Sequence, residues 1–180
     1  GPIIDRLAQE GNPKAFSFTK PKQEGRFDFS FSGIKTAVLN LCEKTKFLPP
    51  LWGKVRMGVK NPQPLSSPTR GEGRRVRFIR DLCASFQESV MRWVTEKTIL
   101  ACEEERLKHI VVGGGVSANS RLRALLTEET RVRGMQPFLP PFELTTDNAA
   151  MIARFGYTLY REGVRSDYTM IADPSLKIGD

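Results

Sequence analysis

Residues 107–126 constrain the fold of this chain more than any other stretch of its sequence. Within Leu107–Asn119, the apolar and β-branched run from Ile110 to Val112 predicts a buried strand that leads into a turn of three glycines. Residues 119–126 carry leucines at helical spacing, so the turn is expected to lead into a helix. This order is typical of α/β proteins that bind a nucleotide, because glycines let a ligand approach the main chain and the first helical N–H groups face it. Asn119 stands at the mouth of the turn, where its amide can donate and accept hydrogen bonds.

The glycine turn alone leaves other interpretations open. Gly113-x-Gly115-x-x-Ala118 loosely fits the dinucleotide fingerprint, which also requires an acidic residue about 20 residues later, after a second strand. The next apolar run, at 135–139, ends in two prolines, and Glu143 is the only acid nearby. The dinucleotide interpretation is therefore disfavoured, whereas a tight strand–helix turn without a ligand stays open.

Length and composition exclude several classes of protein. A chain of 180 residues with 39% hydrophobic residues can bury one sizeable core. No apolar run approaches the roughly 20 residues that a membrane-spanning helix needs. The three cysteines are an odd number without CxxC spacing, which predicts reduced thiols and a cytoplasmic location. The single histidine, His109, is insufficient for a metal site and is expected at the surface.

The basic charge is concentrated in one segment. The net charge is +8, and residues 51–80 contain eight basic residues and one acid, which leaves about +1 for all other residues. Prolines and glycines interrupt this segment, so 47–80 is predicted to be a flexible, disordered basic insertion. It is either an arm that binds RNA or, as we favour, an insertion without a function of its own.

The first 46 residues predict two helices and a strand. Residues 1–8 have a helical apolar pattern, and without an initiator Met we expect the chain to be the C-terminal part of a longer protein. Phe27-Asp28-Phe29-Ser30-Phe31 alternates strictly and predicts a strand. Ser32 is expected to cap the helix that follows. Ser32-x-x-Lys35 also matches a serine–lysine nucleophile pattern, but the partner motifs of that pattern are missing from the sequence.

The second half predicts an alternation of helices and strands. A long helix is expected from Asp81, as its N-cap, to about Glu105, and its buried stripe consists of Leu82, Phe86, Val90, Trp93, Val94 and Ala101. A helix over 119–133 ends at Gly134, and a short strand follows at 135–139.

Asp147 precedes a last predicted helix whose apolar positions are Ile152, Phe155 and Leu159. Asp147 either caps this helix or projects into the same cleft as Asn119, where its carboxylate is free to bind a metal. The sequence supplies no other ligands for such a metal site.

Five motifs, in this order, resemble the tRNA adenosine threonylcarbamoyltransferases (TsaD type, formerly called O-sialoglycoprotein endopeptidases), and the bacterial branch most closely. They are GPIID at 1–5, DFSFSGIKT at 28–36, ASFQ at 84–87, GGGVSAN at 113–119 and TDNAAMIA at 146–153. The resemblance covers nearly all of the chain except about 47–80.

The resemblance implies an α/β fold of the actin/Hsp70/sugar-kinase type (ASKHA), with two lobes and a nucleotide cleft between them. Residues 1–46 then correspond to the end of the first lobe and the first elements of the second. Residues 81–180 correspond to the nucleotide-binding lobe, here incomplete.

The implied reaction transfers a threonylcarbamoyl group from threonylcarbamoyl-AMP to the exocyclic amine of the adenosine beside the anticodon, in tRNAs that read ANN codons. The implied partners are tRNA, threonylcarbamoyl-AMP and accessory proteins of the pathway (a paralogous dimer partner and a small ATPase), with no membrane. By motif, Gly1 and Asp5 correspond to contacts with the adenylate ribose and Asn119 to a further nucleotide contact. No residue is assigned a catalytic role.

Asp147 corresponds to the carboxylate ligand of one divalent metal ion, Fe or Zn. The family holds that ion with two histidines of an HxxxH motif, which this sequence lacks. The chain is therefore expected to be an inactive portion of the enzyme. A nucleotide-binding, ATPase-like lobe or an RNA-binding module without transferase activity is the alternative, and a metallopeptidase is disfavoured because neither a nucleophile nor a full zinc site is present.

Overall fold

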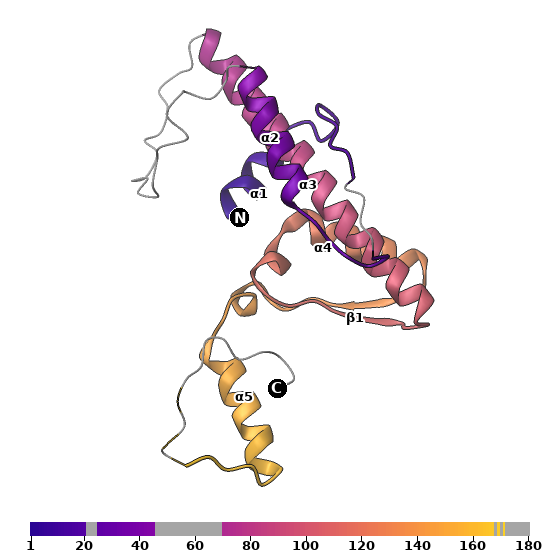
Figure 1. The fold of residues 1–180 in the computed structure, drawn as a ribbon, viewed down its shortest axis with the longest axis vertical. Helices are drawn as coiled ribbons and strands as arrows, with labels where there is room; N and C mark the ends of the chain where they lie inside the picture. The colour runs from indigo at the N-terminus through magenta and orange to yellow at the C-terminus, as the bar shows by residue number, and fades with distance from the viewer. Residues whose placement is uncertain (21–24, 46–69, 168, 170, 172–180) are drawn as a thin grey trace.

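The computed structural model describes residues 1–20, 25–45, 70–167, 169 and 171 of the chain. Its central element is the long helix α3 (Arg70–Glu104), and α1 (Pro2–Ala8), α2 (Ser32–Lys44) and α4 (Ser120–Val132) lie along it (Figure 1). Two short strands, β1 (His109–Val111) and β2 (Gln136–Phe138), flank α4 in sequence. Two short 3-10 helices, η1 (Gly115–Ala118) and η2 (Phe142–Leu144), and the final helix α5 (Ala149–Arg161) complete the described part.

Helix α3 begins earlier than the sequence pattern predicts. Asp81 lies inside the helix, so its predicted role as N-cap is wrong, and its carboxylate instead accepts a hydrogen bond from the main-chain N–H of Asn12 at 2.7 Å. The predicted flexible insertion is also wrong at its C-terminal end, because 70–80 is helical. The reason is packing: Phe78 on this part of the helix meets the ring of Phe16 edge-on, with 5.2 Å between ring centres. The rest of that insertion, 47–69, lies outside the described residues.

The segment after α1 packs tightly against α3. A Cβ on Gly11 would lie 2.1 Å from the carbonyl oxygen of Arg80, so only glycine permits this approach. The hydroxyl of Ser85, a fully buried residue of α3, donates to the carbonyl of Asn12 and accepts from the N–H of Phe16, both at 3.1 Å. These contacts fix α1 and the chain that follows it on α3.

The strand predicted at residues 27–31 is wrong. Among the described residues it has no partner strand, and its side chains contact α3 instead. The ring of Phe29 stacks on that of Phe31 and lies under the ammonium group of Lys97, which also donates to the carbonyl of Asp28. Strict alternation favours a strand only where a sheet edge is available for pairing, and aromatic packing against a helix satisfies the same side chains.

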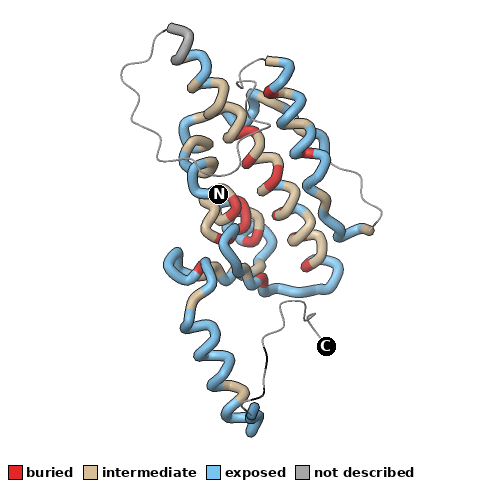
Figure 2. The backbone as a smooth tube through the Cα atoms, turned by 60° about the vertical axis from the view of Figure 1, so that its left-hand side comes forward, coloured by how far each residue is buried: buried red, intermediate tan, exposed pale blue. Residues whose placement is uncertain are grey.

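Helix α2 begins at Ser32, as the helical spacing predicts, and buries Ile34 and Cys42. Its N-cap is Phe31, so the predicted capping role of Ser32 is wrong by one residue. The helix lies beside α3 in both views (Figures 1 and 2).

Strands β1 and β2 pair in parallel, with Ile110 opposite Pro137. Helix α4 forms the crossover between them and buries Leu122, Leu125 and Leu126. Buried positions gather where α3 and α4 face each other (Figure 2). The order of strand, turn, helix and second strand predicted from the sequence is confirmed, and the mixture of helices with a small parallel sheet confirms the α/β class. The predicted burial of the first strand is wrong, because only Ile110 of β1 is buried and Val111 is 83% exposed.

Helix α5 forms where predicted, but Asn148 caps it in place of Asp147. The side chain of Asn148 accepts a hydrogen bond from the N–H of Met151 at 3.2 Å. None of the α5 residues is buried, and the helix lies apart from the body formed by α3 and α4 (Figure 1). Its predicted apolar positions Ile152 and Phe155 are therefore exposed.

Two further sequence predictions agree with the structure. The three cysteines are free thiols, and burial raises the pKa of each thiol. His109 is exposed, with its ring beside that of Phe138. Over the described part of the chain, no helix combines the length and apolar character needed to cross a membrane.

Glu88 joins α3 to α4 through a charged pair. Its carboxylate accepts from the guanidinium of Arg121 on α4 at 2.5 and 3.0 Å, and from Arg92, one turn further along α3. The side chain of Glu88 is only 19% exposed. Hydrogen bonding from Arg121, and secondarily from Arg92, holds the pKa of the Glu88 carboxyl below its ordinary value, against the opposing effect of burial.

Replacing Glu88 with glutamine is expected to lower the free energy of unfolding by about 1–2 kcal/mol at pH 7, because charge-assisted hydrogen bonds become neutral ones. The folded-state pKa of Glu88 lies below its unfolded value. Its stabilisation is therefore complete above the ordinary glutamate pKa of about 4.3 and is lost as the pH falls through the folded pKa. Urea unfolding of both proteins from pH 7 down to pH 3 measures the difference.

Glu105→Gln is the matched control for Glu88→Gln, because Glu105 is exposed just after the end of α3. Its loss of stability is expected to be below about 0.5 kcal/mol at every pH. A difference between Glu88→Gln and the unmodified chain that stays constant down to pH 3 would contradict the assigned role of the charge.

Candidate functional site

The glycine turn after β1 is open to solvent. Gly114 has φ +80° and ψ 168°, a conformation that is essentially restricted to glycine, and η1 follows it. Gly113, Gly114 and Gly115 are exposed, and a Cβ on any of them would meet no atom within 4 Å. The main chain of the turn is therefore accessible to a ligand, as the strand–turn–helix pattern predicts.

Asn119 connects this turn to helix α4. Its side-chain oxygen accepts from the N–H of Leu122 at 3.0 Å and so caps the helix. Its side-chain NH₂ group donates to the side-chain oxygen of Gln87 at 2.9 Å and lies 3.4 Å from a carboxylate oxygen of Asp5. The amide thus contacts three different elements, and its orientation is fixed.

Asp5 lies at the N-terminal end of α4, although it belongs to α1. Its carboxylate accepts from the hydroxyl of Ser120 at 2.7 Å and from the main-chain N–H of the same residue at 3.3 Å. The side-chain NH₂ group of Gln87 donates to it at 3.0 Å. The positive end of a helix stabilises a carboxylate in this position. We call Asp5, Gln87, Asn119 and Ser120 the Asp5 cluster.

The structure brings the side chains of two predicted site residues together, places Gly1 one helical turn before Asp5, and leaves Asp147 without a contact to them. Asp5 and Asn119 meet in the Asp5 cluster. Gly1 is exposed at the start of α1, where its carbonyl accepts from the N–H of Asp5 at 3.2 Å. Asp147 is exposed just before α5 and shares no hydrogen bond with the Asp5 cluster. No contact therefore supports the prediction that Asn119 and Asp147 lie in one pocket.

Sequence reasoning gave no role to Gln87 or Ser120. Gln87 is buried on the same side of α3 as Ala84, where the helical pattern requires apolar residues. A polar residue on such a stripe is the signal that could have identified it, because a buried amide needs partners. Ser120 carries no comparable signal, since serine is ordinary in a first helical turn.

The described residues do not form a metal site. No group of three His, Cys, Asp or Glu side chains among them is placed to hold an ion. Asp147 by itself supplies one carboxylate, which does not complete a site for iron or zinc. Its role as a metal ligand stays a prediction.

Comparison with known proteins gives these residues a context. A family model described as "TsaD: tRNA N6-adenosine threonylcarbamoyltransferase" matches residues 1–154. The chain belongs to this family. The resemblance inferred from five short motifs is thereby confirmed.

Proteins named tRNA N6-adenosine threonylcarbamoyltransferase are similar to the chain over most of its length. Those of Dictyoglomus turgidum and Clostridium beijerinckii are each 38% identical to it over 100% of this chain and 46% of their own length. The protein of Riemerella anatipestifer is 41% identical over 91% of this chain and 41% of its own length. The chain therefore spans about half the length of the curated relatives that it matches.

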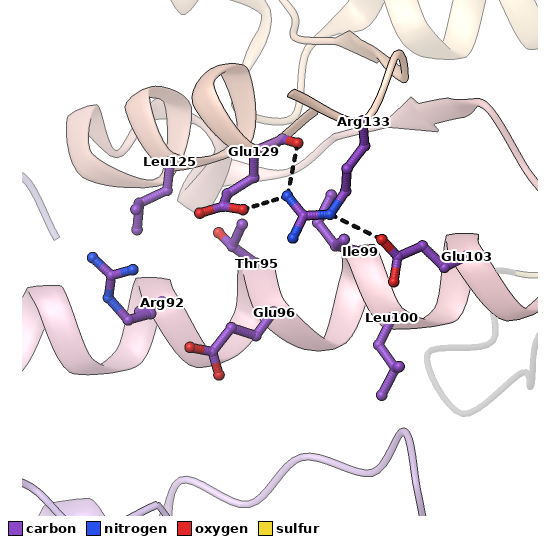
Figure 3. A pocket seen from close by; sticks show the side chains of 9 residues that line it. All are labelled: Arg92, Thr95, Glu96, Ile99, Leu100, Glu103, Leu125, Glu129 and Arg133. Atoms are coloured by element: carbon purple, nitrogen blue, oxygen red, sulfur yellow. Dashed lines mark hydrogen bonds and ion pairs between the residues drawn. The ribbon is translucent and has the colours of Figure 1, made fainter. Parts of the chain in front are cut away.

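A groove between α3 and α4 has a volume of about 400 Å³. None of the Asp5 cluster lines it, and its charges are paired: Arg133 bridges Glu103 and Glu129 at 2.9 and 2.5 Å (Figure 3). The hydroxyl of Thr95 in this groove is buried without a partner, and the residue is 2% exposed. The groove is thus separate from the candidate nucleotide site of this TsaD-family chain.

Thr95→Val is expected to raise the free energy of unfolding by about 1 kcal/mol, because it removes a buried hydroxyl that lacks a hydrogen bond and keeps the shape of the side chain. Thr98→Val is the matched control on the same helix. The hydroxyl of Thr98 donates to the carbonyl of Val94 at 2.9 Å, so no gain is expected there. Denaturant unfolding measures both, and a destabilised Thr95→Val would show that the hydroxyl holds a water or ligand.

Gly114→Ala is expected to lower the free energy of unfolding by about 1–3 kcal/mol, because alanine is strained at its backbone angles. Gly113→Ala is expected to cost less, since Gly113 lacks a positive φ and both positions have open space around a Cβ. The difference in melting temperature between the two variants measures the cost of backbone strain at position 114. Equal costs would show that the turn relaxes without strain.

Proposed function

We propose that this chain supplies the nucleotide-binding part of a tRNA N6-adenosine threonylcarbamoyltransferase, with Gly1, Asp5 and Asn119 as contacts to threonylcarbamoyl-AMP. One observation carries the proposal. In a chain of this family, an oriented carboxylate and an oriented amide lie together at the open glycine turn after a parallel strand. The family membership and the small parallel sheet also support an incomplete ASKHA-type lobe.

The chemistry of the Asp5 cluster suits a nucleoside. Among the described residues, the Oδ2 atom of Asp5 accepts only the main-chain N–H of Ser120, so this oxygen can accept one further hydrogen bond, from a ribose hydroxyl. The exposed main chain of the glycine turn can approach the phosphate of the adenylate. Gln87 and Ser120 act as positioning residues, because they fix the carboxylate from α3 and α4.

In the proposed reaction, the exocyclic amine of the tRNA adenosine attacks the carbamoyl carbon. A C–N bond forms, the bond from that carbon to the adenylate oxygen breaks, AMP leaves, and the amine loses one proton to the surroundings. The part assigned to this chain is orientation: a fixed adenylate converts the encounter with tRNA into an oriented reaction.

The remaining partners are part of the same proposal. We propose that the enzyme acts in the cytoplasm with a paralogous dimer partner and a small ATPase, and that Asp147 is one ligand of its iron or zinc ion. The described residues do not complete a metal site, so no step of the reaction is assigned to the ion. By itself, the chain is then expected to bind the nucleotide without transferring the group.

Asn119→Ser and Asp5→Asn test nucleotide binding directly on this chain. Serine keeps the helix cap but is too short to replace the amide, so Asn119→Ser should stay folded. Calorimetric titration with a non-hydrolysable threonylcarbamoyl-AMP analogue is expected to show a Kd raised about tenfold or more in each variant, a loss of about 1.4 kcal/mol. Asp167→Asn, at an exposed aspartate after α5, is the control and should bind normally. Unchanged affinity for the analogue in both variants would contradict the assignment of the Asp5 cluster as the binding site for threonylcarbamoyl-AMP.

Transfer is tested separately with a chimera. The part of the Dictyoglomus turgidum relative that this chain does not cover is joined ahead of Gly1, and the product is incubated with threonylcarbamoyl-AMP and tRNA. The chimera is expected to form threonylcarbamoyladenosine, whereas the chain alone should not, and Asn119→Ser in the chimera should raise the KM for the donor about tenfold. A chimera that binds the donor analogue and tRNA but leaves the tRNA unmodified would favour a nucleotide-binding module without transferase activity.

A further inference from the structure

The N-terminal part of α3 carries basic charge that the Asp5 cluster does not use. Residues 73–80 contain four arginines and no acid. Arg74, Arg75 and Arg77 are exposed, and Arg77 is the extreme case, with 85% of its side chain accessible. We call these three residues the arginine stripe.

The arginine stripe lacks close carboxylate partners, which other arginines of α3 and α4 have. Arg92, Arg121 and Arg133 each lie within 3 Å of a glutamate oxygen. Among the side chains that the structure describes, which on α3 begin at residue 73, no carboxylate pairs with Arg74 or Arg75, and Arg77 has only the carboxylate of Asp81 at 3.8 Å. Arg74 and Arg77 are three residues apart on one helix and repel each other weakly, and a bound anion would relieve this repulsion.

The position of the arginine stripe fits a large anionic substrate. Arg77 and Gln87 lie on one continuous helix, ten residues and therefore about 15 Å apart along its axis. A tRNA held at the stripe by its phosphates can thus extend to the Asp5 cluster. The planar fork of arginine also matches the geometry of phosphate oxygens.

We propose that the arginine stripe binds the phosphate backbone of the tRNA whose adenosine is modified. This inference rests on the proposed function for the identity of the RNA. It also gives a role to part of the basic segment, which sequence reasoning favoured as having none. Phosphate contacts of this kind supply affinity and orientation without base specificity.

The test measures RNA binding by this chain in the absence of any donor nucleotide. The variant Arg74→Gln/Arg75→Gln/Arg77→Gln removes three charges and keeps helix-forming side chains. The control, Arg131→Gln/Arg154→Gln/Arg161→Gln, removes the same charge from exposed positions on α4 and α5. Binding of a fluorescent tRNA is followed by anisotropy at several salt concentrations.

The stripe variant is expected to raise the Kd for tRNA at least tenfold at about 0.1 M salt. It should also flatten the plot of log Kd against log salt by about 2, since each phosphate contact contributes about 0.7–0.9 to its slope. The control variant should change the Kd less than about threefold. Equal losses in both variants would show an effect of net charge alone and overturn the proposal, and so would unchanged binding in the stripe variant.

Two further measurements test the nature of this binding and its independence from the donor site. Heparin at matched charge should compete with tRNA, because the arginine stripe recognises anionic groups without base specificity, and a lack of competition would overturn the proposal. Asn119→Ser should leave the affinity for tRNA unchanged while it weakens binding of the donor analogue. A failure of the Asp5 cluster as the donor site is therefore distinguishable from a failure of the arginine stripe.

Discussion

The carboxylate of Asp5 is the interaction on which the site depends. It accepts hydrogen bonds from Gln87 on α3 and from Ser120 on α4, while it belongs to α1. A buried or half-buried carboxylate is costly without such partners, so the three helices must stay in register for it to remain satisfied. Asn119, which follows the glycine turn, donates to Gln87 and lies beside the same carboxylate.

Helix α3 makes this arrangement possible because it is long enough to serve several purposes. Its N-terminal turns present the arginine stripe, its middle holds Gln87 and Glu88, and its last turns bury Ile99 and Cys102 against the strands. A rigid helix fixes the distance between the proposed RNA-binding surface and the proposed nucleotide site without a flexible connection. In the proposed enzyme, binding of tRNA and binding of the adenylate are therefore two contacts with one scaffold.

Helix α5 and the sheet leave apolar surface exposed. Ile152 and Phe155 on the helix face solvent, as does Val111 on β1, which is 83% exposed. Parallel sheets are normally covered on both faces, so a two-stranded sheet with one open face falls short of a complete α/β layer. The match to about 46% of the length of the Dictyoglomus turgidum relative agrees with this picture.

The sequence alone determined the local elements. The strand, glycine turn and helix from β1 to α4, the second strand and the place of Asn119 follow from hydrophobic periodicity and backbone preferences, which act over a few residues. Predictions from periodicity were wrong where side chains interact with residues distant in the sequence. Phe29 packs on α3 through Lys97. Asp81 accepts a hydrogen bond from the main chain of Asn12 instead of capping a helix.

Only the tertiary structure decided that Asp5, Gln87 and Asn119 meet, and that Asp147 does not join them. Asp5 is separated from Gln87 by 82 residues and from Ser120 by 115. No local pattern encodes a hydrogen bond across such a distance. The packing of α1 and α4 on α3 selects these partners, because a polar group that enters that interface must be paired there.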